Sequence, residues 1–157
     1  MLTEIIFKNY RCFKSHTLPF KEETIIVGRN NAGKSTVIEG IRIISIITER
    51  YKNLPFCNVP DWLDIPTGEK GVRVDLTGLG LSWENLFNHY GGPPASISAK
   101  FSNGTSIATY LGPEGKMHGV VRDARRKIVK SKGEARMIHL PRNVSMKMRH
   151  GFRQIKL

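Results

Sequence analysis

Apolar residues near the start of the chain occur in short runs that predict strands. Residues 3–10 are rich in β-branched and aromatic side chains and predict a strand, and residues 16–20 predict a short second strand in which Pro19 favours an edge position. Residues 23–27 predict a further strand, which contains the continuous apolar run Ile25-Ile26-Val27 and is stopped by Gly28. Such a run is typical of a short strand that is buried in a sheet.

The spacing of apolar residues changes after Gly28 and becomes helical. Val37, Ile41 and Ile44 recur every three to four residues, and further isoleucines between them fill a second face. This periodicity predicts a helix over roughly residues 34–50 that packs on more than one side.

From residue 71 onward the pattern is typical of β-structure. Residues 72–76 and 96–101 alternate between apolar and polar side chains, and both stretches predict strands. The Asn103-Gly104 pair predicts a hairpin turn that leads into a strand over residues 106–110. Shorter predicted elements are a helix over residues 82–90 and strands over 115–121 and 136–140.

Charge is distributed unevenly along the chain. The length of 157 residues fits one domain, and the formal net charge is +12. Residues 116–157 hold 13 lysines and arginines against two acidic residues, whereas residues 1–115 hold 12 against 11. Such a basic segment attracts polyanions, so we hypothesise contact with DNA or another nucleic acid. A solvated basic face and a face that meets an acidic protein are the alternatives.

Cysteine content and apolar runs indicate the compartment. Cys12 and Cys57 form no metal-binding or redox motif, and two unpaired thiols fit a reducing environment. No basic leader opens the chain, and its most apolar stretch, residues 41–47, is shorter than the ~20 residues that span a bilayer. We therefore expect a soluble, cytoplasmic protein with no membrane partner.

One motif carries the candidate chemistry. It consists of Gly28, Arg29, Asn30, Asn31, Ala32, Gly33, Lys34 and Ser35, and it matches the G-x-x-x-x-G-K-[ST] pattern of a phosphate-binding P-loop in full. The motif lies between a predicted strand and a predicted helix, which is the context that a P-loop requires. We therefore predict that the chain binds a nucleoside triphosphate together with Mg²⁺.

Each part of the motif has its own physical reason. Gly28 and Gly33 allow a tight turn and a close approach of the backbone to phosphates. The N–H groups of the loop and of the first helical turn, including that of Thr36, favour an anion at the helix N-terminus. Lys34 brings a compact positive charge to the β- and γ-phosphates, and the Ser35 hydroxyl is an oxygen ligand for Mg²⁺.

The residues around the motif resemble the N-terminus of ABC-type ATPases that act on DNA. These are the SMC, RecF and SbcC-like heads and the overcoming-lysogenization-defect (OLD) family. The resemblance covers residues 1 to about 47 and rests on the opening strand, on Asn9-Tyr10-Arg11-Cys12-Phe13, and on Asn30 and Ser35-Thr36 within the P-loop. Arg29 departs from the proline that is commoner at its position.

The resemblance implies an α/β fold, in which a P-loop NTPase core combines a mixed sheet and a P-loop helix with an antiparallel β lobe. We divide the single domain into a P-loop core at residues 1–55, a β-rich lobe at 70–121 and a basic C-terminal segment at 122–157. The resemblance also implies ATP and Mg²⁺ as ligands, dimerisation around ATP, and a position of Arg11 near the nucleotide or as a brace of the head. The resemblance further implies that the protein acts in DNA repair, DNA maintenance or defence against phage.

Motifs that such ATPases use for hydrolysis are missing from the chain. It contains no Leu-Ser-Gly-Gly signature and no apolar strand that ends in Asp-Glu, and we interpret Asp75 as a strand residue of the β lobe. Gln154 is the only glutamine and is a candidate Mg²⁺ ligand by position alone. Phosphoryl transfer also needs a group that positions the nucleophile. We therefore expect an N-terminal half of a head that binds ATP and hydrolyses it only with a second copy or with a longer ATPase or nuclease partner.

Other functions of a P-loop protein remain open. A GTPase would carry an Asn-Lys-x-Asp motif, which is absent here, whereas a kinase could use residues 122–127 as a basic lid. A non-enzymatic alternative is a nucleic-acid-binding module in residues 116–157 beside a vestigial or regulatory P-loop. Phe152 is the one phenylalanine in that segment, which has no tryptophan or tyrosine, so a stacking platform for single strands is not evident.

Overall fold

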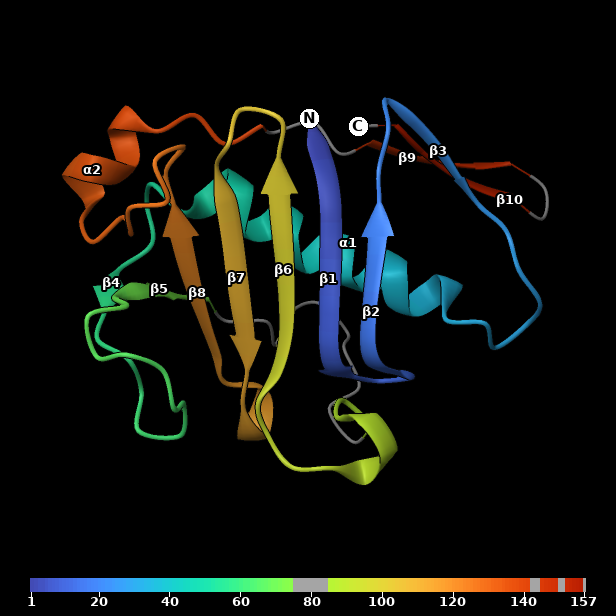
Figure 1. Ribbon diagram of the computed structural model, residues 1–157, viewed down its shortest axis with the longest axis horizontal. Coiled ribbons are helices and arrows are strands. Elements are labelled where there is room, and N and C mark those ends of the chain that lie inside the picture. Colours follow the sequence, from blue (N-terminus) through green and yellow to red (C-terminus); the bar gives the residue numbers. More distant parts are fainter. Residues whose placement is uncertain (75–84, 142–144, 150–151, 157) are drawn as a thin grey trace.

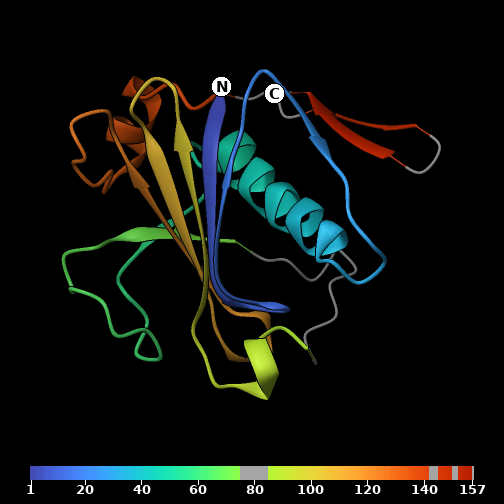
Figure 2. The ribbon, with the colours of Figure 1, turned by 45° about the vertical axis from the view of Figure 1, so that its right-hand side comes forward.

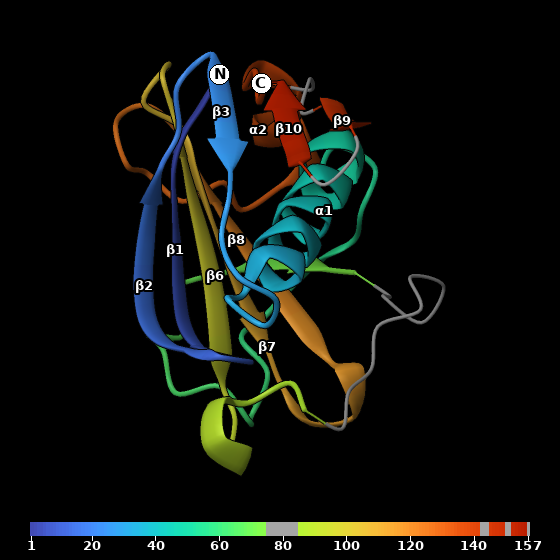
Figure 3. The same ribbon diagram turned by 90° about the vertical axis from the view of Figure 1, so that its right-hand side faces the viewer.

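The computed structural model describes residues 1–74, 85–141, 145–149 and 152–156. A large sheet is covered on one face by a long helix, and a small second sheet lies on the same side as that helix (Figure 1, Figure 3). Within the described part of the chain, no helix is long and apolar enough to cross a membrane. The fold is of the expected α/β class.

Among the described residues, seven strands form the large sheet in the order β2-β1-β6-β7-β8-β5-β4. Their bounds are Leu2–Tyr10 (β1), Phe13–Pro19 (β2), Phe56–Cys57 (β4), Gly71–Arg73 (β5), Ala95–Phe101 (β6), Ser106–Leu111 (β7) and Met117–Arg122 (β8). The structure confirms the strands predicted over 3–10, 96–101, 106–110 and 115–121. It also confirms the edge position of β2, which begins at Phe13 rather than at residue 16.

Every strand pair among the described residues is antiparallel, whereas we expected a mixed sheet. The reason lies in the connections. The pairs β1–β2, β6–β7 and β7–β8 are consecutive in the chain and are joined by short turns, which only antiparallel neighbours allow. Strand β1 also pairs with β6, so the predicted P-loop core and the predicted β lobe share one sheet.

The helix α1 has the predicted bounds, Lys34–Arg50, and crosses one face of the large sheet (Figure 1, Figure 2). Ile41 and Ile43, which point in different directions from the helix axis, are both fully buried, so the helix packs on more than one side as predicted. At Gly40 the helix lies close against the sheet, because a Cβ there would lie 2.4 Å from the ring of Phe7 on β1. This contact fixes the helix against the strand that opens the chain.

The small sheet joins the strand before the P-loop to the end of the chain. Strand β3 (Glu23–Ile26) pairs with β10 (Phe152–Lys156), which pairs with β9 (Ser145–Arg149). The prediction that β3 is buried is wrong, because Ile25 is 62 % and Val27 is 64 % exposed. Among the described residues β3 is the edge of a three-stranded sheet, so only part of its apolar surface is covered.

The strand predicted over residues 136–140 is also wrong. The short helix α2 (Lys132–Met137) ends inside that stretch and takes in Arg136 and Met137, and residues 138–140 form no strand. Its N-terminus is capped by Ser131, whose Oγ accepts a hydrogen bond from the backbone N–H of Glu134 at 3.2 Å. This cap satisfies a donor that would otherwise lack a partner, and it favours a helical turn over a strand.

Two further predictions fall partly outside the described residues. The helix predicted over 82–90 is wrong for its described part, where only the 3₁₀ turn η2 (Asn88–Tyr90) forms, and residues 82–84 are not described. The strand predicted over 72–76 is confirmed at β5, and Asp75 lies outside the described residues. A second 3₁₀ turn, η3, covers Pro113–Gly115.

Candidate functional site

The P-loop connects β3 to α1 and turns sharply where the helix begins. Gly33 precedes the helix with a φ of +83°, and Asn31 also has a positive φ, of +65°. A Cβ on Gly33 would lie 2.6 Å from the ring of Phe13 and 3.0 Å from Cys12 Sγ. Glycine is therefore required at position 33 both by the backbone angle and by the close packing of the β1–β2 turn.

The side chain of Lys34 folds back over the loop. Its Nζ donates to the carbonyl oxygens of Gly28 at 2.6 Å and of Arg29 at 2.7 Å. An ammonium group has three donors, so two of them hold the charge over the loop and the third can reach a phosphate oxygen. The lysine is thus held beside the N-terminus of α1, where the helix dipole also favours an anion.

The first turn of α1 presents backbone N–H groups that the helix itself does not use. Within α1, the N–H of Val37 bonds back to the carbonyl oxygen of Gly33 at 3.0 Å. The N–H groups of Lys34, Ser35 and Thr36 precede this helical ladder, because the first N–H groups of a helix lack an acceptor within it. Together with the dipole they form a site suited to phosphate.

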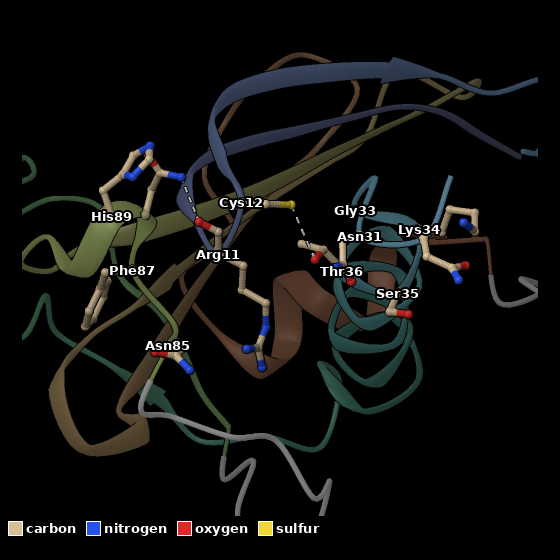
Figure 4. Close-up of a pocket in the computed structure, with 12 residues that line it drawn as sticks. Arg11, Cys12, Asn31, Gly33, Lys34, Ser35, Thr36, Asn85, Phe87 and His89 are labelled. Carbon is tan, nitrogen blue, oxygen red and sulfur yellow. Dashed lines mark hydrogen bonds between the residues drawn. The ribbon is translucent and has the colours of Figure 1, made fainter. Parts of the chain in front are cut away.

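A cavity of about 760 Å³ opens in front of the P-loop, a size typical of small-molecule sites. Three segments line it: the P-loop with the start of α1, the β1–β2 turn, and the stretch that leads into η2 (Figure 4). The lining residues are Arg11, Cys12, Asn30, Asn31, Gly33, Lys34, Ser35, Thr36, Asn85, Phe87, Asn88 and His89.

The four other predicted site residues are Gly28, Arg29 and Ala32 in the P-loop and Gln154 on β10. Gly28 and Arg29 contribute the carbonyl oxygens that hold Lys34, and Ala32 donates its N–H to the carbonyl oxygen of Arg29 at 3.2 Å. Gln154 lies on β10 in register with Ile25 of β3. Its backbone is therefore beside the strand that precedes the P-loop, and its role as a Mg²⁺ ligand stays a prediction.

Arg11 lies on the β1–β2 turn, between the P-loop and the stretch before η2 (Figure 4). Its Nε and NH2 donate to Glu39 Oε1 at 3.0 and 2.7 Å, and the Tyr10 hydroxyl donates to the same oxygen at 2.7 Å. Burial, and after it the Glu39 carboxylate, raises the pKa of Tyr10 far above its usual value, so this hydroxyl stays a donor. Arg11 therefore braces the turn against α1, and its approach to a nucleotide stays a prediction.

Hydrogen bonds fasten the stretch before η2 to the β1–β2 turn. The Arg11 N–H donates to the carbonyl oxygen of Leu86 at 2.8 Å, and the side-chain amide of Asn88 donates to the carbonyl oxygen of Arg11 at 2.7 Å. The Asn88 N–H donates to Asn9 Oδ1 at 3.2 Å, and Phe87 forms an isolated antiparallel bridge with Tyr10. The stretch before η2, which forms one wall of the cavity, is therefore attached to the β1–β2 turn.

Five of the lining residues were not found from the sequence: Cys12, Asn85, Phe87, Asn88 and His89. Cys12 directly follows Arg11 in the chain, and its Sγ donates to Thr36 Oγ1 at 3.6 Å. The other four belong to no motif, and Asn88 is held at the site by hydrogen bonds to Asn9 and Arg11, which precede it by nearly 80 positions. Adjacency to Arg11 was the one signal that could have indicated Cys12.

The electrostatics of the cavity suit an anionic ligand. No aspartate or glutamate is among the described residues that line it, whereas Lys34 and the N-terminus of α1 contribute positive charge. Ser35 is exposed and lines the cavity, so its hydroxyl fits the oxygen chemistry that Mg²⁺ prefers. The described lining thus provides a phosphate cradle and one metal-ligand candidate, without a carboxylate that could position water.

A second polar cluster lies outside this cavity, where the segment before β5 meets β8. His118 is 1 % exposed, with its Nε2 3.1 Å from the carbonyl oxygen of Glu69 and its Nδ1 3.7 Å from Cys57 Sγ. Burial lowers the pKa of His118, and the contact with Glu69 opposes part of that effect. The Glu69 carboxylate pairs with Arg122 at 2.7 Å, so the cluster is held by its own hydrogen bonds.

Comparison with known proteins agrees with the geometry of the site. A family model described as an AAA ATPase domain matches residues 1–110, which include the P-loop and every residue that lines the cavity. No curated protein matches the chain.

Proposed function

Because the chain belongs to the AAA ATPase domain family, in which membership implies nucleotide binding, we propose that its ligand is ATP with Mg²⁺. One observation carries the proposal: the cavity unites Lys34, Ser35 and the start of α1, whose first N–H groups precede the helical hydrogen bonds. Backbone donors, a positive charge and a hydroxyl ligand at one helix terminus are the groups that a triphosphate–Mg²⁺ complex requires. Arg11 would lie on the path from the phosphates to the rest of the ligand.

Within that family we propose an ATPase of the SMC, RecF or OLD kind. The resemblance around Arg11 and the P-loop supports this, as does the attachment of Arg11 to α1 through Glu39. The described lining of the cavity contains no carboxylate, which favours binding without efficient hydrolysis by the chain alone. A second copy or a longer ATPase or nuclease partner would supply the missing group.

An exposed basic surface supports a role on DNA. It consists of Arg125, Arg126, Lys127, Lys130, Lys132 and Arg136. The two acidic residues among them are engaged elsewhere: Asp123 Oδ1 accepts the backbone N–H groups of Arg125 and Lys127, and Glu134 Oε2 accepts that of Lys130. The six basic side chains outnumber these two carboxylates, and the remaining positive charge attracts a phosphate backbone.

The test of ATP binding is calorimetry with Mg²⁺ and ATP on the wild-type chain, Lys34→Ala and Lys14→Ala. Lys14 is an exposed residue of β2, so its substitution removes the same charge outside the cavity. We expect Lys34→Ala to weaken binding about ten- to a hundredfold, because charge-assisted hydrogen bonds contribute about 1.5–3 kcal/mol. Lys14→Ala should bind as the wild type does. No binding by a folded wild-type chain would refute the proposal.

The test of the DNA role is a salt titration of DNA binding with Arg125→Ala, Arg126→Ala and Lys127→Ala combined. We expect weaker binding and a smaller dependence on salt for the triple variant, because each phosphate contact adds close to one unit to the slope. Binding that ATP strengthens would support an ATPase that acts on DNA. Equal binding with and without ATP would favour the non-enzymatic nucleic-acid-binding alternative.

A further inference from the structure

The cavity extends beyond the P-loop to a wall that no motif predicts, and this wall is made by residues 85–89. We propose that this wall binds the nucleoside half of ATP, with Phe87 as a stacking surface for the base. The inference rests on the proposed binding of ATP. The inference adds to that proposal the residues that would recognise the base and the ribose.

The two ends of the cavity differ in chemistry. The P-loop end carries Lys34 and the N-terminus of α1, while the opposite wall consists of Asn85, Phe87 and His89, which bear an amide, an aromatic ring and an imidazole. Figure 4 shows Arg11 between the two ends. A nucleoside triphosphate has the same division, with charge at one end and a flat, polar-edged aromatic ring at the other. Stacking on an aromatic side chain suits any base.

Phe87 is held in place before any ligand arrives. Its backbone bridges Tyr10, and the hydrogen bonds of Asn88 and Leu86 to the β1–β2 turn fix the residues on both sides. The ring is half-buried and packs against the core, while the residue also lines the cavity. A ring that is already ordered loses little conformational freedom on binding, which favours its use as a platform.

Asn88 and His89, which follow Phe87 in this wall, differ in their burial and in their hydrogen bonds. Asn88 is 8 % exposed, and its amide already donates to Arg11, so we assign it to holding the wall. His89 is exposed and has a positive φ of 49°. Phe87 is therefore the residue of this wall that combines a large flat surface with a fixed position.

The experiment compares Mg²⁺–ATP with Mg²⁺–tripolyphosphate, which keeps the phosphates and lacks the nucleoside. Calorimetry is run on the wild-type chain, Phe87→Leu and Phe87→Trp, after thermal unfolding has shown that each is folded. We expect Phe87→Leu to weaken ATP binding about tenfold and to leave tripolyphosphate unchanged, because leucine keeps apolar packing but removes stacking. Phe87→Trp should bind ATP at least as well as the wild type.

Phe56→Leu is the matched control. Phe56 is a half-buried aromatic residue that packs against the same core from β4 and does not line the cavity. Unchanged ATP binding by Phe87→Leu would overturn the inference, and so would an equal loss of both ligands or an equal loss in Phe56→Leu. Wild-type binding of tripolyphosphate as tight as that of ATP would overturn it as well, while leaving the P-loop assignment intact. Absence of binding of either ligand would instead refute the proposed function.

Discussion

Substitution of Gly33 by alanine tests how the P-loop is supported. Alanine would have to adopt a φ of +83° and would place its Cβ 2.6 Å from the ring of Phe13 and 3.0 Å from Cys12 Sγ. The left-handed conformation costs a non-glycine residue about 1–2 kcal/mol, and an overlap within a packed region costs about 1–3 kcal/mol. We therefore expect a loss of about 2–5 kcal/mol in the free energy of unfolding.

This loss corresponds to a fall of roughly 5–15 °C in the unfolding temperature of a domain of this size. Differential scanning calorimetry measures it, and Gly68→Ala is the control because a Cβ at that position would meet nothing within 4 Å. Affinity for Mg²⁺–ATP should fall together with stability, because relief of the overlap moves the loop that holds Lys34.

A second substitution separates the two costs. In the Gly33→Ala background, Phe13→Leu removes the ring that the new Cβ would meet and leaves the backbone strain in place. Gly33→Ala should therefore cost less stability in the Phe13→Leu background than in the wild-type chain. The difference between these two costs is the coupling energy of a double-mutant cycle. Equal unfolding temperatures of Gly33→Ala and Gly68→Ala, or zero coupling between positions 13 and 33, would refute the reasoning.

Three further predictions concern other parts of the structure. Glu39→Gln should cost about 1–3 kcal/mol of stability, measured by urea unfolding, because it weakens the charged partner of Arg11 and Tyr10; a cost near zero would contradict the brace. Alkylation of Cys12 should be slowed by Mg²⁺–ATP, measured by mass spectrometry with Cys57 as the internal reference, because only Cys12 lines the cavity. The lowered pKa of His118 means that the folded state binds fewer protons, so stability should be complete above the unfolded pKa near 6.5 and fall as the pH drops below it; a profile unchanged by His118→Gln would argue against this.

Local signals explain which parts of the fold could be predicted. The helix over 34–50 and the turn at Gly33 depend on neighbours in the chain, and the periodicity of the isoleucines indicated both faces of α1. A prediction from local apolar content was wrong for residues 136–140, for which it gave a strand. The cap from Ser131 to the N–H of Glu134 starts the helix α2 at Lys132, and this helix continues to Met137.

Long-range contacts explain the rest. The stretch 23–27 looks like a buried strand because its apolar residues are contiguous, yet Ile25 stays 62 % exposed because β3 pairs only with β10 among the described residues. Phe87 and Asn88 reach the cavity through bonds to the β1–β2 turn that no local pattern encodes. The sequence could therefore indicate the phosphate-binding half of the site, and the wall opposite it required the structure.

The pairing of β3 with β10 has a consequence for the order in which the protein is made. Ile26, at the edge of the P-loop, pairs with Arg153, which follows it by 127 positions. At a synthesis rate of about 5–20 residues per second, roughly 6–25 s pass between the appearance of these two residues. During that interval Ile25 and Ile26 lie on a strand without its partner, while the P-loop motif and α1 are synthesised. The growing chain thus carries an unpaired strand edge beside its P-loop, in a period when chaperone binding or premature association would compete with folding.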